Sequence, residues 1–170
     1  MMFHTRTGLS FSIVPPVSSD LGAIVSIEQE AFPTPWTRLM FEAELTGNPF
    51  GRVFVAKGEK IKGQQGDLLG YICYWVVFEE LRFLNVAVHE SVRRQGIGRQ
   101  LIEFAIQDGI KNRTKRALLE VRTSNAVARN MYECLGFHSY GFRKAYYTNP
   151  TEDAILMERT LLDPAPCNRP

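Results

Sequence analysis

Residues 85–101 read NVAVHESVRRQGIGRQL. The stretch predicts the end of a strand, then a loop, then the start of a helix. Gly96 and Gly98 allow backbone N–H groups to point into one concavity, and the helix adds its unpaired first-turn N–H groups and the positive end of its dipole. We therefore predict an anion-binding cradle. Cationic donors suited to phosphate oxygens stand beside it at Arg93, Arg94 and Arg99.

Two common nucleotide motifs are absent from this stretch. No Lys-Ser or Lys-Thr pair follows the glycines, as a P-loop requires, and no third glycine stands at the spacing of the dinucleotide fingerprint. Taken alone, a G-x-G before a helix fits a simple turn and helix cap equally well. The rest of the chain has to decide between these interpretations.

Outward from this stretch, the apolar periodicity predicts an α/β chain. Helices are expected over residues 21–31, 37–45, 97–110 and 126–135, and strands over 10–14, 52–57, 68–77, 81–88, 117–121, 137–144 and 154–158. The two prolines of residues 32–36 predict an irregular loop, and residues 146–150 are expected to connect the last two strands. We expect one domain over residues 10–160, after an extension of residues 1–9 and before a tail of residues 161–170.

Composition excludes several classes of protein. The chain has 170 residues, 45% of them hydrophobic and 11% aromatic, as expected for one globular domain. Its net charge of +2 is too small to argue for general nucleic-acid binding. The longest apolar stretch, near residues 71–78, is far shorter than the roughly 20 residues that cross a bilayer. We expect neither a membrane span nor a signal peptide.

The cysteines argue for a reducing environment. There are three, Cys73, Cys134 and Cys167, with no C-x-x-C pair and no neighbouring histidine. Neither a disulfide framework nor a metal site is expected. A cytoplasmic location fits best.

Several blocks of the sequence resemble one enzyme superfamily. Residues 94–99, RQGIGR, resemble the Q/R-x-x-G-x-G/A pyrophosphate loop of the GNAT N-acetyltransferases. Residues 119–126, LEVRTSNA, and 131–137, MYECLGF, resemble a second and highly specific block of the same superfamily. Residues 31–36 and 143–157 are similar to the branch that acetylates a ribosomal-protein alanine (RimI). The likeness spans about residues 10–159.

The resemblance implies a fold and a cosubstrate. The fold would be the α/β GNAT fold, a mixed, mostly antiparallel sheet that splays between the fourth and fifth strands, with helices on both faces. Acetyl-CoA would lie in the splay, with no metal. By resemblance, its binding residues are Val86, Ala87, Val88, Arg93, Arg94, Gln95, Gly96, Ile97, Gly98, Arg99 and Asn125. The backbone N–H groups of residues 86–88 would donate to the thioester oxygen, and Asn125 would bond the pantetheine arm.

The resemblance also implies two catalytic side chains, each of which has a simpler interpretation. Glu120 would be the general base that deprotonates the acceptor amine; otherwise it is an outward-facing strand carboxylate. Tyr132 would protonate the leaving thiolate; otherwise it packs in the core. Asn125 could equally be a helix N-cap. Phe32, Pro35, Trp36, Tyr146 and Tyr147 resemble loops that frame an acceptor peptide, although burial against the sheet is the alternative.

The activity implied is transfer of acetyl from acetyl-CoA to a protein α-amine, by resemblance the N-terminal alanine of the eighteenth small-subunit ribosomal protein. No direct contact with nucleic acid or membrane is expected. Two alternatives stay open. One keeps the fold but takes a small amine or a lysine as acceptor, and the other is a non-catalytic acyl-CoA-binding regulator, against which the presence of both Glu120 and Tyr132 argues.

Overall fold

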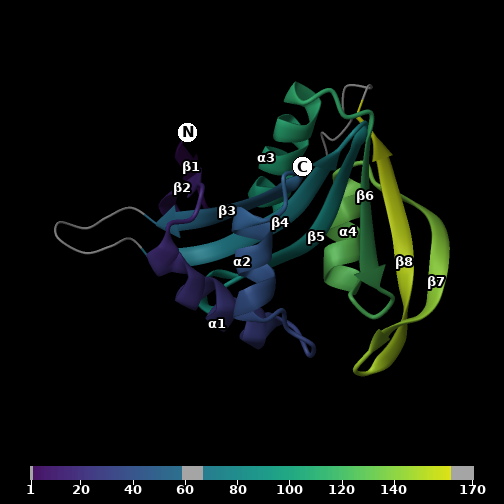
Figure 1. Cartoon of the computed structure of the whole chain (residues 1–170), viewed down its shortest axis with the longest axis horizontal. Coiled ribbons are helices and arrows are strands. Elements are labelled where there is room, and N and C mark those ends of the chain that lie inside the picture. The colour runs from purple at the N-terminus through teal and green to yellow at the C-terminus, as the bar shows by residue number, and fades with distance from the viewer. Residues whose placement is uncertain (1, 59–66, 162–170) are drawn as a thin grey trace. The chain divides into compact units, whose positions relative to one another are not determined.

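The computed structural model describes residues 2–58 and 67–161 (Figure 1). The stretch between the strands expected over residues 52–57 and 68–77 lies mostly outside the described residues, as does nearly all of the expected C-terminal tail. The chain divides into two compact units. One is built from Met1–Tyr74 and Asn85–Ala105, and the other from Trp75–Leu84 and Ile106–Pro170.

The helices and strands follow the expected α/β pattern. The strands are β1 (Met2–His4), β2 (Ser10–Val14), β3 (Gly51–Gly58), β4 (Leu68–Val77), β5 (Glu80–Val88), β6 (Arg116–Arg122), β7 (His138–Thr148) and β8 (Thr151–Thr160). The α-helices are α1 (Leu21–Ala31), α2 (Arg38–Thr46), α3 (Ile97–Lys111) and α4 (Ala126–Cys134), and the 3-10 turns are η1 (Ser18–Asp20) and η2 (Glu90–Val92).

The strands form a mixed sheet in the order β1-β2-β3-β4-β5-β6-β8-β7. The described pairings of β1 with β2, β2 with β3, β6 with β8 and β7 with β8 are antiparallel, whereas β5 and β6 are parallel. The strands expected as fourth and fifth are β5 and β6. Their described pairing covers only Glu80–Arg82 with Arg116–Leu118, while β6 pairs with β8 over seven residues. The predicted fold class is confirmed.

In the first unit, helices cover both faces of the strands. Residues of α1 and α2 form one core cluster with Val55 of β3 and Tyr71 of β4, and Figure 1 shows the two helices over these strands. The preceding residue of β3, Phe54, points to the opposite face from Val55, because side chains alternate along a strand. There its ring meets Phe104 of α3 at 4.7 Å between centroids. The unit is therefore a three-layer α/β/α arrangement.

In the second unit, α4 packs against the strands through aromatic rings. Tyr132 of α4 and Phe83 of β5 both contact Phe137, with ring centroids 5.8 and 6.0 Å apart. Gly136, at φ +84°, lets the chain leave α4 in the left-handed region, as the predicted helix stop requires. Strand β7 is the edge strand, and most of its side chains are exposed.

Two strands differ from the expectation. Met2–His4 form β1, antiparallel to β2, although only an extension was expected there. Gly8, at φ +86°, makes the turn that allows this pairing. Residues 146–148, expected in a connection, continue β7, because a register shift between Arg143 and Tyr147 absorbs the extra residues and lets the strand rejoin β8.

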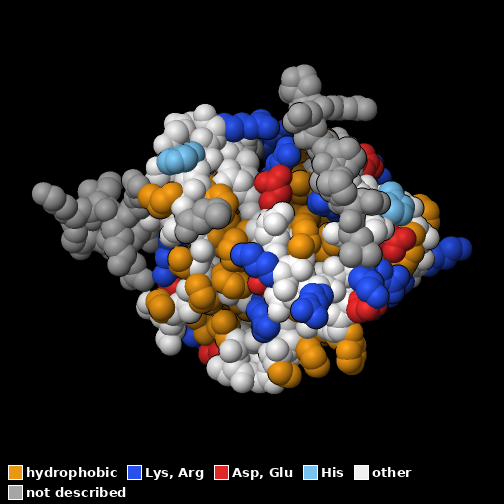
Figure 2. All heavy atoms as spheres, turned by 90° about the horizontal axis from the view of Figure 1, so that it is seen from above, with side chains coloured by type: hydrophobic (Ala, Val, Ile, Leu, Met, Phe, Trp, Pro, Cys, Tyr) orange, Lys and Arg blue, Asp and Glu red, His pale blue; other side chains and the backbone are white. Residues whose placement is uncertain are grey.

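The surface mixes charge and apolar groups. On the face drawn in Figure 2, basic and acidic side chains both lie among hydrophobic ones. Within residues 2–58 and 67–161, no helix combines the length and the apolar character needed to cross a membrane.

Candidate active site

The segment between β5 and α3 has the backbone that an anion cradle needs. Gly96 has φ +90°, a conformation that residues with a Cβ rarely adopt. A Cβ built there would have 3.8 Å to its nearest neighbour, Gln100 Nε2, so the requirement for glycine is conformational rather than steric. Helix α3 begins at the next residue, as predicted, and presents its first-turn N–H groups at this point.

Two of the three predicted arginines have partners within the first unit. Arg93 donates from Nε to the carbonyl of Val88 at 3.0 Å, which ties the loop to the end of β5. Arg99 donates from Nε to Glu103 at 2.9 Å along the exposed side of α3. Arg93 therefore stabilises the strand that carries Val86–Val88, in addition to any contact with a phosphate.

The N-terminal segment, for which only an extension was expected, forms hydrogen bonds to the same loop. The Arg6 N–H donates to the Gln95 carbonyl at 3.2 Å, and the Thr7 hydroxyl donates to Gln95 Oε1 at 2.7 Å. Gln100 Nε2 donates to the His4 carbonyl at 2.9 Å. The hairpin signal at Gly8, between two short strands, could have revealed this contact.

The proline-containing loop that follows α1 is held by a buried carboxylate. Trp36 donates its backbone N–H to Glu28 Oε1 at 2.8 Å, and its ring lies 5.3 Å from that of Phe41. Phe32 and Trp36 are half-buried against the core, whereas Pro35 is exposed. Burial, the alternative to a role in peptide binding, therefore applies in part to Phe32 and Trp36. Glu28 was not predicted, although its position beside Ile27 on the apolar face of α1 is the signal that could have found it.

In the second unit, Glu120 interrupts a buried run of β6. Leu119 and Val121 on either side are buried, whereas the Glu120 side chain keeps 32% of its surface exposed. Its Oε1 lies 3.4 Å from Nη1 of Arg143, which comes from β7. The carboxylate is therefore accessible and has a cation beside it.

Tyr132 is a buried phenol on α4. Its side chain is 7% exposed and its ring packs edge-on against Phe137. Burial, with a smaller contribution from Tyr147, raises the pKa of the Tyr132 phenol above its usual value. The core-packing alternative therefore holds, and it leaves the hydroxyl protonated at neutral pH. A protonated phenol is what a proton donor requires.

Asn125 caps α4, as the simpler interpretation expected. Its Oδ1 accepts the backbone N–H of Ala128 at 3.1 Å. This bond uses the oxygen of the amide, so the Nδ2 group is the part of the side chain that suits a carbonyl acceptor.

The two predicted tyrosines of β7 lie beside arginines. The Arg122 guanidinium stands 4.1 Å from the centroid of the Tyr147 ring, and Arg143 stands 4.9 Å from that of Tyr146. Burial, together with the neighbouring Tyr146, raises the pKa of Tyr147 to about 12, although Arg122 opposes the shift. The two rings meet edge to face at 5.1 Å.

A strained backbone presents these tyrosines. Ala145 has φ +48°, unusual for a residue with a Cβ, and its N–H donates to Asp153 Oδ1 at 2.8 Å. The Ser124 backbone N–H, the Ser124 hydroxyl and Arg122 hold the pKa of Glu152 below its usual range. These contacts join β7 and β8 to the start of α4.

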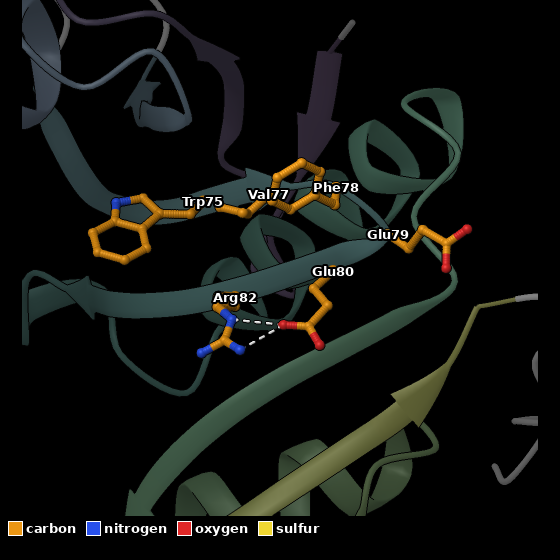
Figure 3. A pocket seen from close by; sticks show the side chains of 6 residues that line it. All are labelled: Trp75, Val77, Phe78, Glu79, Glu80 and Arg82. Atoms are coloured by element: carbon orange, nitrogen blue, oxygen red, sulfur yellow. Dashed lines mark hydrogen bonds and ion pairs between the residues drawn. The ribbon is translucent and has the colours of Figure 1, made fainter.

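A pocket of the second unit has none of the predicted residues in its lining. It is lined at the β4–β5 turn by Trp75, Val77, Phe78, Glu79, Glu80 and Arg82, where Figure 3 shows the Glu80–Arg82 ion pair. In the described part of the chain, His, Cys, Asp and Glu side chains form no group of three or more that could hold a metal ion.

The predicted site residues therefore fall in both units. The first unit holds the 86–99 segment and the loop at residues 32–36, and the second holds Glu120, Asn125, Tyr132 and the two tyrosines of β7. Glu120 lies inside β6, Tyr132 lies in the last turn of α4, and Asn125 stands at the N-cap of that helix.

Comparison with known proteins assigns this arrangement to a family. Residues 21–137 match the model of the acetyltransferase (GNAT) family. The [ribosomal protein bS18]-alanine N-acetyltransferase of Escherichia coli (strain K12) is 35% identical over 146 residues, which are 82% of this chain and 90% of that protein.

Solved structures agree with this match. The crystal structure of the ribosomal-protein-S18-alanine N-acetyltransferase from Escherichia coli superposes with a TM-score of 0.76 at 33% identity, covering 89% of this chain and 94% of that one. Arabidopsis thaliana NAA60 in complex with acetyl-CoA shares the fold, with a TM-score of 0.80 at 17% identity over 90% of this chain and 99% of that one. The chain belongs to the GNAT acetyltransferase family. It is accordingly an acyltransferase.

Proposed function

We propose that this enzyme transfers the acetyl group of acetyl-CoA to the N-terminal alanine of ribosomal protein bS18. The observation that carries the proposal is the 35% identity, over 82% of the chain, with the E. coli enzyme of that name. We also propose a cytoplasmic location, which suits an enzyme whose acceptor is a ribosomal protein, and we propose neither a membrane nor a nucleic acid as a direct partner.

The first unit is proposed to bind acetyl-CoA. The backbone of Gln95–Arg99 opens a helix through a glycine at positive φ, a geometry that suits pyrophosphate oxygens. Arg93, Arg94 and Arg99 add positive charge near this loop. The backbone N–H groups of Val86, Ala87 and Val88 are proposed to donate to the thioester oxygen, where negative charge develops.

Glu120 is proposed as the base. An α-amine has a pKa of about 7.7–8.0 and is mostly protonated at neutral pH, so a proton must leave before the nitrogen can attack. The partial exposure of the Glu120 carboxylate supports this role, because the group has to be reached by a substrate amine or by an intervening water.

Tyr132 is proposed as the acid. The amine nitrogen forms a bond to the acetyl carbon, the carbonyl electrons move to oxygen, and collapse of this intermediate breaks the C–S bond. The thiolate then takes the phenol proton of Tyr132. Before the attack, Glu120 takes one proton from the ammonium and releases it to solvent, and after the attack it takes the second proton that the nitrogen loses. Proton exchange with solvent restores both side chains. The raised pKa of Tyr132 supports a neutral phenol at the start of each cycle.

The remaining predicted residues are proposed to orient the two substrates. Asn125 Nδ2 would donate to a pantetheine carbonyl while Oδ1 caps α4. Phe32, Pro35 and Trp36 of the first unit are proposed to contact the acceptor peptide, and the same role is proposed for Tyr146 and Tyr147 of the second unit. The half-burial of Phe32 and Trp36 supports a rigid rather than an adaptable frame.

Mass spectrometry tests the proposal. The enzyme would be incubated with acetyl-CoA and a panel of acceptors. The panel contains a peptide with the N-terminal sequence of bS18, the same peptide with a blocked N-terminus and an internal lysine, and a set of polyamines. We expect a single acetyl group on the α-amine of the Ala-initiated peptide. Preferred use of the blocked peptide or of a polyamine would overturn the acceptor assignment, and no transfer to any acceptor would favour a non-catalytic regulator.

A further inference from the structure

Glu28, near the end of α1, is a fully buried carboxylate to which the proposed chemistry gives no role. None of its surface is exposed. Oε1 accepts the backbone N–H of Trp36 at 2.8 Å and Nδ2 of Asn85 at 2.9 Å, and Oε2 accepts the hydroxyl of Tyr71. Four segments of the first unit therefore meet at one carboxylate: α1, the 32–36 loop, β4 and β5.

A buried acidic group is retained only where its contacts compensate for lost hydration. Burial raises the pKa of Glu28, while the bonds from Trp36, Tyr71 and Asn85 oppose the shift. Both Trp36 and Asn85 donate to the same oxygen, Oε1, so this oxygen is an acceptor whether or not Oε2 carries a proton. The bonds from the 32–36 loop and from β5 are therefore independent of the protonation state of Glu28.

Two of the three residues that donate hydrogen bonds to Glu28 lie in, or directly beside, segments proposed to bind substrates. Trp36 closes the loop assigned to the acceptor peptide, and Asn85 directly precedes Val86–Val88, assigned to the thioester oxygen. Phe32, at the other end of the loop, donates its N–H to the Glu28 carbonyl at 3.0 Å. Backbone and side chain of one residue thus hold both ends of the loop.

We propose that Glu28 is a positioning residue that fixes the acceptor loop, Phe32–Trp36, against the strand that carries Val86–Val88. This inference rests on the proposed function, because it takes that loop as the peptide-binding one. Loss of the carboxylate would misplace the peptide amine relative to the thioester, with little effect on the phosphate-binding backbone of Gln95–Arg99.

Three variants test the proposal. Glu28→Leu keeps the approximate volume but removes both acceptor oxygens. Glu28→Gln keeps an Oε1 acceptor for Trp36 and Asn85 and turns its amide toward the Tyr71 oxygen, so it serves as the conservative rescue. Glu30→Leu, on an exposed position of the same helix, is the matched control.

We expect Glu28→Leu to raise the peptide KM by at least about tenfold, with a further fall in kcat, because small displacements of a bound substrate cost large factors in rate. The acetyl-CoA Kd measured by calorimetry should stay within about twofold of wild type. Glu28→Gln and Glu30→Leu should both stay close to wild type. A peptide KM unchanged in folded Glu28→Leu, or a Glu28→Gln variant as impaired as Glu28→Leu, would overturn the proposal.

Two further measurements keep the test decisive. If Glu28→Leu does not fold, Tyr71→Phe removes only one donor and should raise the peptide KM several-fold; an unchanged KM would count against the proposal. Hydrogen exchange of the Trp36 amide needs no acceptor: it should be slow in wild type and in Glu28→Gln but fast in Glu28→Leu. Failure of wild type to acetylate the peptide would refute the proposed function, whereas unchanged Trp36 exchange would refute the positioning role.

Discussion

Arg143 and Glu120 form an ion pair that reaches across β8, with Arg143 Nη1 3.4 Å from Glu120 Oε1. The same guanidinium lies over the ring of Tyr146. The proposed base is therefore joined through one cation to the segment proposed to contact the acceptor. Within the second unit, this contact would couple the proposed base to the proposed peptide-binding segment.

Replacing Glu120 by Gln should lower turnover at pH 7 by about 100-fold or more, the usual contribution of a general base. Part of the loss should be recovered as the pH rises through about 8, because the free α-amine then loses its proton without help. Initial rates on an Ala-initiated peptide from pH 6 to about 9.5 would measure this recovery. Glu133→Gln, at an exposed position of α4, is the control. Parallel profiles for Glu120→Gln and wild type would eliminate Glu120 as the base.

Arg143→Gln separates stability from catalysis. An ion pair between partly exposed groups contributes about 0–1 kcal/mol, so the free energy of unfolding should change by less than about 1 kcal/mol. The kcat/KM for the peptide should nevertheless fall several-fold, since both Glu120 and Tyr146 lose the group beside them. Lys144→Gln, at the next position of β7, is the matched control. Equal kcat/KM values for the two variants would show that the ion pair does not orient the base.

Tyr132→Phe should retain acetyl-CoA binding and lose transfer, because it deletes the phenol proton and keeps the ring. Single-turnover rates are the appropriate measurement, since slow product release could mask the chemical step. Tyr140→Phe, at an exposed position of β7, is the control. A single-turnover rate equal to wild type would remove Tyr132 from the mechanism.

The raised pKa of Tyr132 also predicts the alkaline behaviour of the protein. The phenol stays protonated in the folded state when an unfolded tyrosine, with a pKa of about 10, has begun to ionise. Stability associated with this group is thus complete below about pH 10 and is lost as the pH rises above it. Unfolding measured in denaturant between about pH 9 and 11 should show that loss in wild type and a smaller one in Tyr132→Phe. Equal losses in the two proteins would contradict the burial argument.

Gly98→Val should abolish acetyl-CoA binding, because its side chain would occupy the space in which the backbone amides approach the pyrophosphate. Gly96→Ala should bind more weakly and lose about 1–2 kcal/mol of stability, the cost of a Cβ in the left-handed region. Calorimetry and thermal unfolding would measure both effects. Gly22→Ala, where a Cβ meets only Arg38 Nη2 at 3.9 Å, is the control. Unchanged affinity in folded Gly98→Val would refute the pyrophosphate assignment.

Thr7→Val tests the N-terminal brace. It removes the 2.7 Å bond to Gln95 while keeping a β-branched side chain of similar size. A hydrogen bond is worth about 1 kcal/mol, so the acetyl-CoA Kd should rise by about fivefold. Thr46→Val, which removes a hydroxyl bond from α2, should leave it unchanged. A Kd equal to wild type in Thr7→Val would mean that the loop keeps its shape without the brace.

Much of the fold was predictable because its signals are local. The helix start at Ile97 follows from a glycine that must adopt positive φ, and the cap at Thr37 from a hydroxyl that accepts the Met40 N–H. The end of α4 at Gly136 has the same kind of cause. In each case, the residue that determines the structure lies within a few positions of the backbone that it stabilises.

The differences from the predictions arise where distant segments meet. β1 forms because Met2–His4 find the backbone of β2, and β7 extends to Thr148 because Asp153 on β8 holds the backbone at Ala145. The residues of β1 and of the end of β7 do not by themselves show that these segments pair with another strand. Strand pairing depends on a partner whose position is known only once the sheet exists.

The candidate site shows the same division. The sequence by itself determined the family and the identity of the residues proposed for phosphate binding and for chemistry, because these are recognised by residue type and spacing. Only the tertiary structure decided that Tyr132 is buried, that Arg143 faces Glu120, and that Glu28 joins Trp36 to Asn85. Such contacts depend on burial and on distances between segments far apart in the chain, and a one-dimensional pattern contains neither quantity.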